Sequence, residues 1–143
     1  MSAERPRSIL FACTYNRTRS PMAESLARLE LGGEVRVASC GAQPRDEADY
    51  FMLAVLQEIG APRPERPGQG FEELAGEPFD VIVSMTEQSR EQAERIAQAH
   101  GAQVEHWNTA DPTATEGSRD QVLEAYRAVR DDLRSRIRQR FAG

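Results

Sequence analysis

The stretch that decides the fold is Ile9-Leu10-Phe11-Ala12-Cys13-Thr14-Tyr15-Asn16-Arg17-Thr18-Arg19-Ser20-Pro21-Met22-Ala23-Glu24. It begins with a short apolar run, residues 8–12, which is typical of a buried strand and leads directly to Cys13. An apolar-periodic helix follows the loop and ends at Gly32-Gly33. Ser20 is the predicted N-cap of this helix, and Pro21 is its predicted first residue, where the missing N–H costs nothing.

This order of strand, loop and helix predicts an anion-binding site. Free backbone N–H groups point inward at a helix N-terminus, and the positive end of the helix dipole adds to their attraction for an anion. The same environment stabilises the thiolate of Cys13 and makes it a nucleophile, while the guanidinium of Arg19 matches two phosphate oxygens. The predicted phosphate-binding groups belong to Thr14, Tyr15, Asn16, Arg17, Thr18 and Arg19.

At this stretch the sequence resembles the low-molecular-weight protein tyrosine phosphatases and the arsenate reductases that share their fold. The family loop runs Cys-x-Gly-Asn-x-x-Arg-Ser-Pro-x-Ala-Glu, and it is matched here by Cys13, Asn16, Arg19, Ser20, Pro21, Ala23 and Glu24. Tyr15 stands where the family usually has glycine. The resemblance implies that Ser20 stabilises the Cys13 thiolate and that Asn16 shapes the loop with a positive φ, which asparagine tolerates.

Length and composition limit the class of protein. A chain of 143 residues is long enough for one domain with a proper core, and we expect residues 1–143 to form a single domain. The net charge of −5 argues against a nucleic-acid partner. Two cysteines do not make a disulfide scaffold, and the start of the chain is too polar for a signal peptide or membrane span. We therefore expect a cytoplasmic protein without a membrane partner.

The remaining pattern alternates strands and helices. Further strands are predicted at 35–39, 80–85 and 103–107, and helices at 46–59, from Thr86 to about His100, and after Ser118. Residues 61–70 are rich in proline and glycine and predict a surface connection, followed by one helical turn at 71–74. The predicted fold is α/β, a three-layer sandwich with a four-stranded parallel sheet in order 2-1-3-4 and helices on both faces. Its ligand site should lie where the loops leave the strands near the switch point.

Asp111-Pro112 supplies a second motif. In a loop, Asp-Pro alone commonly marks only a turn. Here it follows the predicted fourth strand and precedes the last helix, where the family has its catalytic acid. The resemblance therefore implies that Asp111 first protonates the leaving oxygen and then activates water. Thr113 and Ala114 replace the aromatic residues that flank the substrate in tyrosine phosphatases of this family.

The end of the second strand, Ser39-Cys40-Gly41, resembles the family's Ser-Ala-Gly segment. The resemblance gives Ser39 a supporting role toward Asn16. Cys40 has two interpretations, a small buried hydrophobe or a partner for a reversible disulfide that protects Cys13. Arg45 and Tyr50 lie in the segment that lines the family's substrate entrance, although a solvated charge and a half-buried aromatic are equally compatible with the pattern.

These residues predict a hydrolase that cleaves phosphate monoesters, including phosphotyrosine, through a cysteinyl-phosphate intermediate. Its expected catalytic residues are Cys13, Arg19, Asp111 and Ser20, and the mechanism needs no cofactor or metal. One alternative is an arsenate reductase in which an external thiol reductant resolves Cys13, and another is a catalytically weak module that binds phosphate or phosphopeptides. The expected partners are a phosphorylated protein or small molecule, or an inorganic oxyanion. Thioredoxin-coupled reductases carry relay cysteines where this chain has Thr86, Gln88 and Ser89, which argues against that class.

Overall fold

The computed structural model describes residues 5–66 and 68–142. Met1 to Glu4, the beginning of the polar N-terminus, and Pro67, part of the expected connection at 61–70, lie outside the described residues.

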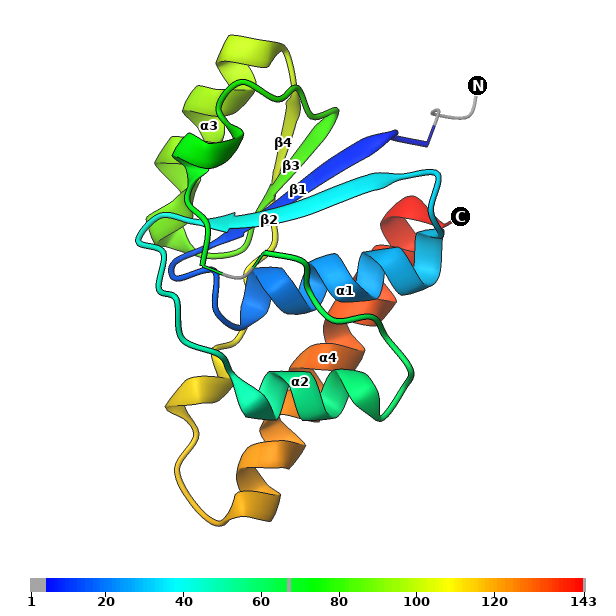
Figure 1. Ribbon diagram of the computed structural model, residues 1–143, viewed down its shortest axis with the longest axis vertical. Coiled ribbons are helices and arrows are strands. Elements are labelled where there is room, and N and C mark those ends of the chain that lie inside the picture. The colour runs from blue at the N-terminus through cyan, green and yellow to red at the C-terminus, as the bar shows by residue number, and fades with distance from the viewer. Residues whose placement is uncertain (1–4, 67, 143) are drawn as a thin grey trace.

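A parallel sheet of four strands forms the centre of the structure (Figure 1). The strands are β1 (Ser8–Cys13), β2 (Arg36–Gly41), β3 (Val81–Ser84) and β4 (Gln103–His106). Their order is β2-β1-β3-β4, which confirms the prediction from the sequence. Cys13 pairs in register with Gly41, and Ala12 pairs with Ser84, so the carboxyl ends of these strands meet at one edge of the sheet.

Helices cover both faces of the sheet and complete three layers (Figure 1). The helices are α1 (Arg19–Leu31), α2 (Tyr50–Gln57), α3 (Glu87–His100) and α4 (Arg119–Phe141), with 3₁₀ turns at Phe71–Leu74 and Pro112–Ala114. The helices α1, α2 and α4 lie on one side of the sheet, and α3 lies on the other.

Strand β1 divides the core because successive side chains of a strand point to opposite faces. Ile9, Phe11 and Cys13 face α1 and α4, whereas Leu10 and Ala12 face α3. Every residue of β1 is buried, as expected for the central strand of a parallel sheet. Burial of each large apolar side chain contributes about 1.5–3 kcal/mol, so the strand that carries Cys13 is firmly held.

Two helix beginnings differ from the sequence prediction. Helix α1 begins at Arg19 with Thr18 as its N-cap residue, so the N-cap assignment to Ser20 was wrong. The Ser20 hydroxyl is instead directed at Cys13, as described below. Helix α2 is shorter than predicted because it begins only at Tyr50, after Asp49, whose carboxylate accepts hydrogen bonds from the N–H groups of Phe51 and Met52.

Asp49 also joins three parts of the structure. Its Oδ2 accepts a hydrogen bond from the Thr18 hydroxyl at 2.5 Å and another from the Tyr126 hydroxyl of α4 at 2.9 Å. At the other end of α2, Glu58 accepts hydrogen bonds from Arg127 and Arg130 of α4. The hydrogen bond from Arg127 is the main cause that lowers the pKa of Glu58 to about 2. These contacts hold α2 and α4 together beside the loop that follows β1.

Glu58→Gln is expected to lower the thermal unfolding temperature slightly at pH 7, because the neutral amide loses the ionic contacts with both arginines. The carboxylate has a pKa of about 2 in the folded chain, against 4.5 ordinarily. Its stabilisation is therefore fully present above about pH 4.5 and is lost as the pH falls through about 2. Thermal unfolding followed by circular dichroism should show the difference between the variant and the wild type shrinking over this interval. A difference that is the same at pH 7 and pH 2 would contradict this assignment.

Candidate active site

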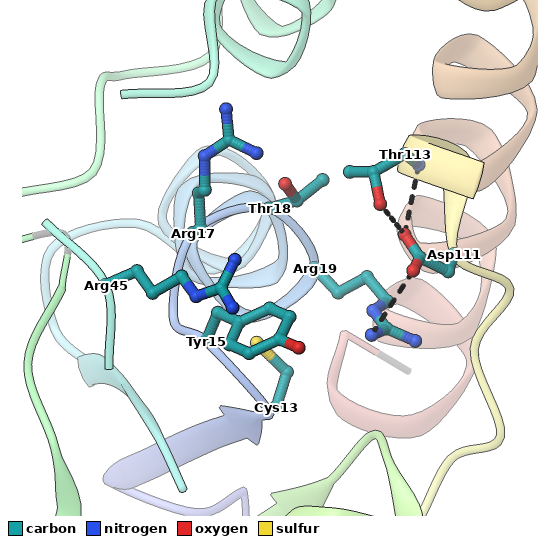
Figure 2. Close-up of a pocket in the computed structure, with 8 residues that line it drawn as sticks. All are labelled: Cys13, Tyr15, Arg17, Thr18, Arg19, Arg45, Asp111 and Thr113. Carbon is teal, nitrogen blue, oxygen red and sulfur yellow. Dashed lines mark hydrogen bonds and ion pairs between the residues drawn. The ribbon is translucent and has the colours of Figure 1, made fainter. Parts of the chain in front are cut away.

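A small cavity lies at the carboxyl edge of the sheet, where the loop between β1 and α1 meets the loop after β4. Its volume is about 100 Å³, and its lining residues are Cys13, Tyr15, Arg17, Thr18, Arg19, Arg45, Asp111 and Thr113 (Figure 2). One water occupies about 30 Å³ in the liquid, so the cavity has room for a small oxyanion. Cys13 and Arg19 of one loop thus share a cavity with Asp111, which is distant in the sequence.

Cys13 lies at the base of this cavity with 2% of its surface exposed. Its Sγ is 2.9 Å from the Oγ of Ser20, in the first turn of α1. The Ser20 hydroxyl is also 3.2 Å from the carbonyl oxygen of Cys40. A thiolate can only accept, so with Cys13 ionised the Ser20 hydroxyl donates to the sulfur. The sulfur therefore lies beside a hydroxyl donor in the first turn of α1, where backbone N–H groups and the helix dipole attract anions.

Asn16 holds the loop between β1 and α1 in its shape. Its φ is +52°, and it is the one non-glycine with positive φ in the part of the chain that the structure describes, which confirms the expectation for this residue. Its Nδ2 donates to the hydroxyl oxygens of Ser20 and Ser39, each at 2.9 Å. Its Oδ1 accepts from the backbone N–H of Gln69, also at 2.9 Å. The side chain of Asn16 is thereby bonded to three separate segments.

A buried glutamate extends this network away from the cavity. The Ser39 hydroxyl donates to Oε1 of Glu24 at 2.6 Å, and Glu24 is 2% exposed. Its Oε2 pairs with Arg28 and accepts the backbone N–H of Glu65 at 3.1 Å. From the sequence, Glu24 was only a match to the family loop and had no role of its own. The sequence feature that could have predicted its burial is its position among small and apolar residues of α1.

Gly41, at the end of β2, allows the strand to lie directly against the loop. A Cβ atom added at this position would lie 2.6 Å from the backbone nitrogen of Asn16 and 2.9 Å from the carbonyl oxygen of Thr14. Such distances are not compatible with any side chain. The loop therefore depends on the absence of a side chain at Gly41 as well as on the hydrogen bonds of Asn16.

Arg19 and Asp111 face each other across the cavity. The Nη2 of Arg19 is 4.0 Å from the Oδ2 of Asp111, and its Nη1 donates to the carbonyl oxygen of Thr109 at 3.2 Å. The other carboxylate oxygen of Asp111, Oδ1, accepts the N–H of Thr113 at 3.0 Å and its hydroxyl at 2.6 Å (Figure 2). Thr113 thus fixes one oxygen of Asp111 and leaves the other directed at Arg19.

The two entrance candidates differ in their positions. Arg45 lines the cavity, and its guanidinium lies over the ring of Tyr15, with the central carbon 4.0 Å from the ring centroid. Tyr50 is not among the lining residues of this cavity and is 78% exposed at the beginning of α2, so the interpretation of Tyr50 as a half-buried aromatic was wrong.

Cys40 lies on the opposite face of the sheet from Cys13. It packs with Leu10 and Ala12, whereas Cys13 packs on the face of α1, and both thiols are free. The register pairs Cys40 with Ala12 and Cys13 with Gly41. A disulfide between the two cysteines would require the backbone to move, so the protective-disulfide hypothesis does not hold. Burial raises the pKa of the Cys40 thiol well above its ordinary value, as expected for an inert core residue.

Within residues 5–66 and 68–142, no three histidine, cysteine, aspartate or glutamate side chains gather as a metal site would require. Over the same ranges, no helix combines the length and apolar character needed to cross a membrane.

Comparison with known proteins places this geometry in a family. A family model described as low molecular weight phosphotyrosine protein phosphatase matches residues 8–142. The chain belongs to this family. Membership of this phosphatase family makes it a hydrolase.

The family has members of several activities. An arsenate reductase from Bacillus licheniformis is 28% identical over 95% of each chain. The tyrosine phosphatase Wzb from Escherichia coli K30, solved with sulphate, is 25% identical with a TM-score of 0.74, covering 94% of this phosphatase and 95% of Wzb. The YwlE arginine phosphatase from Geobacillus stearothermophilus is 29% identical with a TM-score of 0.73, covering 92% and 88%. Relatives of this phosphatase therefore include both phosphatases and arsenate reductases.

Gly41→Ala is expected to weaken vanadate binding by about tenfold or more and to lower the free energy of unfolding by about 1–3 kcal/mol. The added methyl group displaces the loop backbone at Asn16 and Thr14. Titration calorimetry with vanadate and urea unfolding measure the two effects. Gly33→Ala is the matched control, since a Cβ there meets no atom within 4 Å, and it should leave vanadate affinity unchanged. If Gly41→Ala bound vanadate with wild-type affinity, the close approach of Gly41 to the loop backbone would not matter for anion binding.

Proposed function

We propose that this enzyme hydrolyses phosphate monoesters through a cysteinyl-phosphate intermediate. The observation that carries the proposal is that a thiol, a guanidinium and a carboxyl, those of Cys13, Arg19 and Asp111, line one cavity of oxyanion size. Breaking a phosphate ester requires a nucleophile, stabilisation of the transferring phosphoryl group and a proton for the leaving oxygen. These three groups supply one requirement each.

In the first step, the Cys13 thiolate attacks phosphorus, and an S–P bond forms as the P–O bond to the leaving group breaks. The backbone N–H groups of residues 14–19 and the Arg19 guanidinium hold the remaining phosphoryl oxygens and stabilise their charge. Asp111 transfers its proton from Oδ2 to the leaving oxygen. The hydrogen bonds of Thr113 to Oδ1 orient the carboxyl group for this transfer.

In the second step, water attacks phosphorus and the S–P bond breaks. Asp111, now a carboxylate, takes the proton of the attacking water. The Ser20 hydroxyl, 2.9 Å from the Cys13 sulfur, donates to the departing thiolate and so makes it a better leaving group. Inorganic phosphate leaves, and Cys13 and Asp111 return to their starting protonation states without any change of oxidation state.

The walls of the cavity favour phosphate monoesters as a class, phosphotyrosine among them. Thr113 follows Asp111-Pro112 in the lining, so the residues after the acid provide no aromatic surface for a phenyl ring. The partner is accordingly a phosphorylated protein or small molecule. Because the mechanism requires a reduced Cys13, we also propose that the enzyme works in the reducing cytoplasm.

Arsenate reduction is the second candidate, and the 28% identity to an arsenate reductase favours it specifically. Cys13 would displace water from arsenate and form an S–As bond. An external thiol would then attack the Cys13 sulfur, forming a mixed disulfide while the electron pair of the S–As bond leaves with arsenite. A second thiol would release Cys13. Cys40 is on the far face of the sheet and cannot serve, so both thiols must come from a small thiol or a glutaredoxin.

The test is hydrolysis of p-nitrophenyl phosphate by the wild type and two variants. Cys13→Ser is expected to have no measurable turnover, because its hydroxyl is not ionised. Asp111→Asn cannot donate a proton and should lower kcat by about 10²–10⁴-fold. Asp120→Asn, a change of the same kind at an exposed position, should keep wild-type activity.

The alternatives predict different results in the same assay series. Arsenate-dependent oxidation of glutathione or glutaredoxin without ester hydrolysis would replace the phosphatase proposal by the reductase. Vanadate binding without either activity would indicate an oxyanion- or phosphopeptide-binding module. Full activity in Cys13→Ser would exclude the cysteinyl-phosphate mechanism altogether.

A further inference from the structure

The side chains of two arginines at the cavity have no part in the chemistry proposed above. Arg17, Arg19 and Arg45 all line it, and Asp111 is the one carboxylate among the lining residues. Arg19 binds the transferring phosphoryl group, and Asp111 is neutral when it acts as the acid. The cavity thus presents two additional positive charges in a chain whose net charge is −5.

Arg45 is held beside the loop without being neutralised. Its backbone N–H donates to the carbonyl oxygen of Tyr15 at 3.0 Å, and its guanidinium lies over the Tyr15 ring at 4.0 Å. Within the described ranges it forms no ion pair, in contrast to Arg127 and Arg130, which both pair with Glu58. Stacking on an aromatic ring orients a guanidinium and leaves the N–H groups at its edge free to bind an anion.

Arg17 has an unused donor next to the same cavity. Its Nε is buried and has no hydrogen-bond partner among the described residues. Its Nη2 makes one long contact, 3.4 Å, to the carbonyl oxygen of Ala48. A buried donor without a partner is unfavourable, so an arriving acceptor would gain from pairing with this side chain.

The substrate side of the cavity is therefore cationic rather than aromatic. Arg45 covers a face of the Tyr15 ring, and Thr113 stands on the other side beside Asp111. In Figure 2, Arg45 and Asp111 lie on either side of Cys13, and both line the cavity that a bound ester would occupy.

We propose that Arg45 and Arg17 form a second anion subsite. It selects phosphate monoesters whose leaving group carries a carboxylate or a second phosphate near the ester oxygen. This inference rests on the proposed phosphatase function and names the substrate class for it. Arg45 is the specificity-determining residue, because it is oriented by Tyr15, exposed to an incoming ligand and without a carboxylate partner in the described chain.

The test compares two esters that differ in charge and hardly in size, 3-carboxyphenyl phosphate and 3-carbamoylphenyl phosphate. The wild type should show a kcat/KM about tenfold higher for the carboxylate, equivalent to about 1.4 kcal/mol, and the preference should shrink with added salt. In Arg45→Gln the ratio of the two kcat/KM values should fall to about one. Arg63→Gln, an exposed arginine at a different cavity, is the matched control and should keep the preference.

Two further measurements distinguish failure of the subsite from failure of the phosphatase function, and a peptide substrate from a small ester. Calorimetric affinities for 3-carboxybenzylphosphonate and its amide, which cannot be hydrolysed, report the subsite even if the chain has no phosphatase activity. Phosphotyrosine peptides with glutamate or glutamine beside the phosphorylated residue distinguish an acidic peptide from a small dianionic ester. Equal affinities and equal kcat/KM for the charged and neutral members of these pairs in the wild type would overturn the subsite. A ratio of kcat/KM for the carboxylate ester to that for the amide ester that is unchanged in Arg45→Gln would also overturn it.

Discussion

The side-chain amide of Asn16 is the contact on which the active site depends. A loop that points its N–H groups inward at an anion must turn sharply, and the positive φ of Asn16 makes that turn. The amide donates to Ser20 and Ser39 and accepts from Gln69, so one side chain ties the loop to α1, to β2 and to the segment before the 3₁₀ turn at 71–74. Gly41 lets β2 approach closely enough for these bonds to form, and buried Glu24 fixes the far end of the network.

The same hydrogen-bond network links the conformation of the loop to the environment of the nucleophile. The Ser20 hydroxyl that Asn16 holds is the one that touches the sulfur of Cys13, so a change in the loop alters the environment of the nucleophile directly. Phosphate and arsenate are both tetrahedral oxyanions, so either one would meet the same groups of the cavity when Cys13 attacks. The two proposed activities separate afterwards, when either water or a thiol must reach the adduct. Since Cys40 faces the other side of the sheet, this chain supplies no thiol of its own for that step.

Much of the fold follows from local sequence signals. Thr86 and Ser118 cap α3 and α4 as predicted, because each hydroxyl accepts a free backbone N–H three residues along the chain. Strand β1 was recognisable because it is apolar throughout. Ser20 misled the prediction because a hydroxyl before a proline is a typical N-cap, and only the folded chain brings the Cys13 sulfur within 2.9 Å of it. The stacking of Arg45 on Tyr15 and the exposure of Tyr50 likewise depend on the path of residues 42–49. The spacing of apolar residues in the sequence does not predict that path.

The central claim is that Cys13 becomes phosphorylated during turnover. Rapid acid quenching of the enzyme during hydrolysis of p-nitrophenyl phosphate, followed by proteolysis and mass spectrometry, tests it most directly. We expect one phosphoryl group on the peptide that contains Cys13, present during turnover and absent once the substrate is exhausted. Turnover with no phosphoryl group on that peptide, or with the group on another residue, would contradict it.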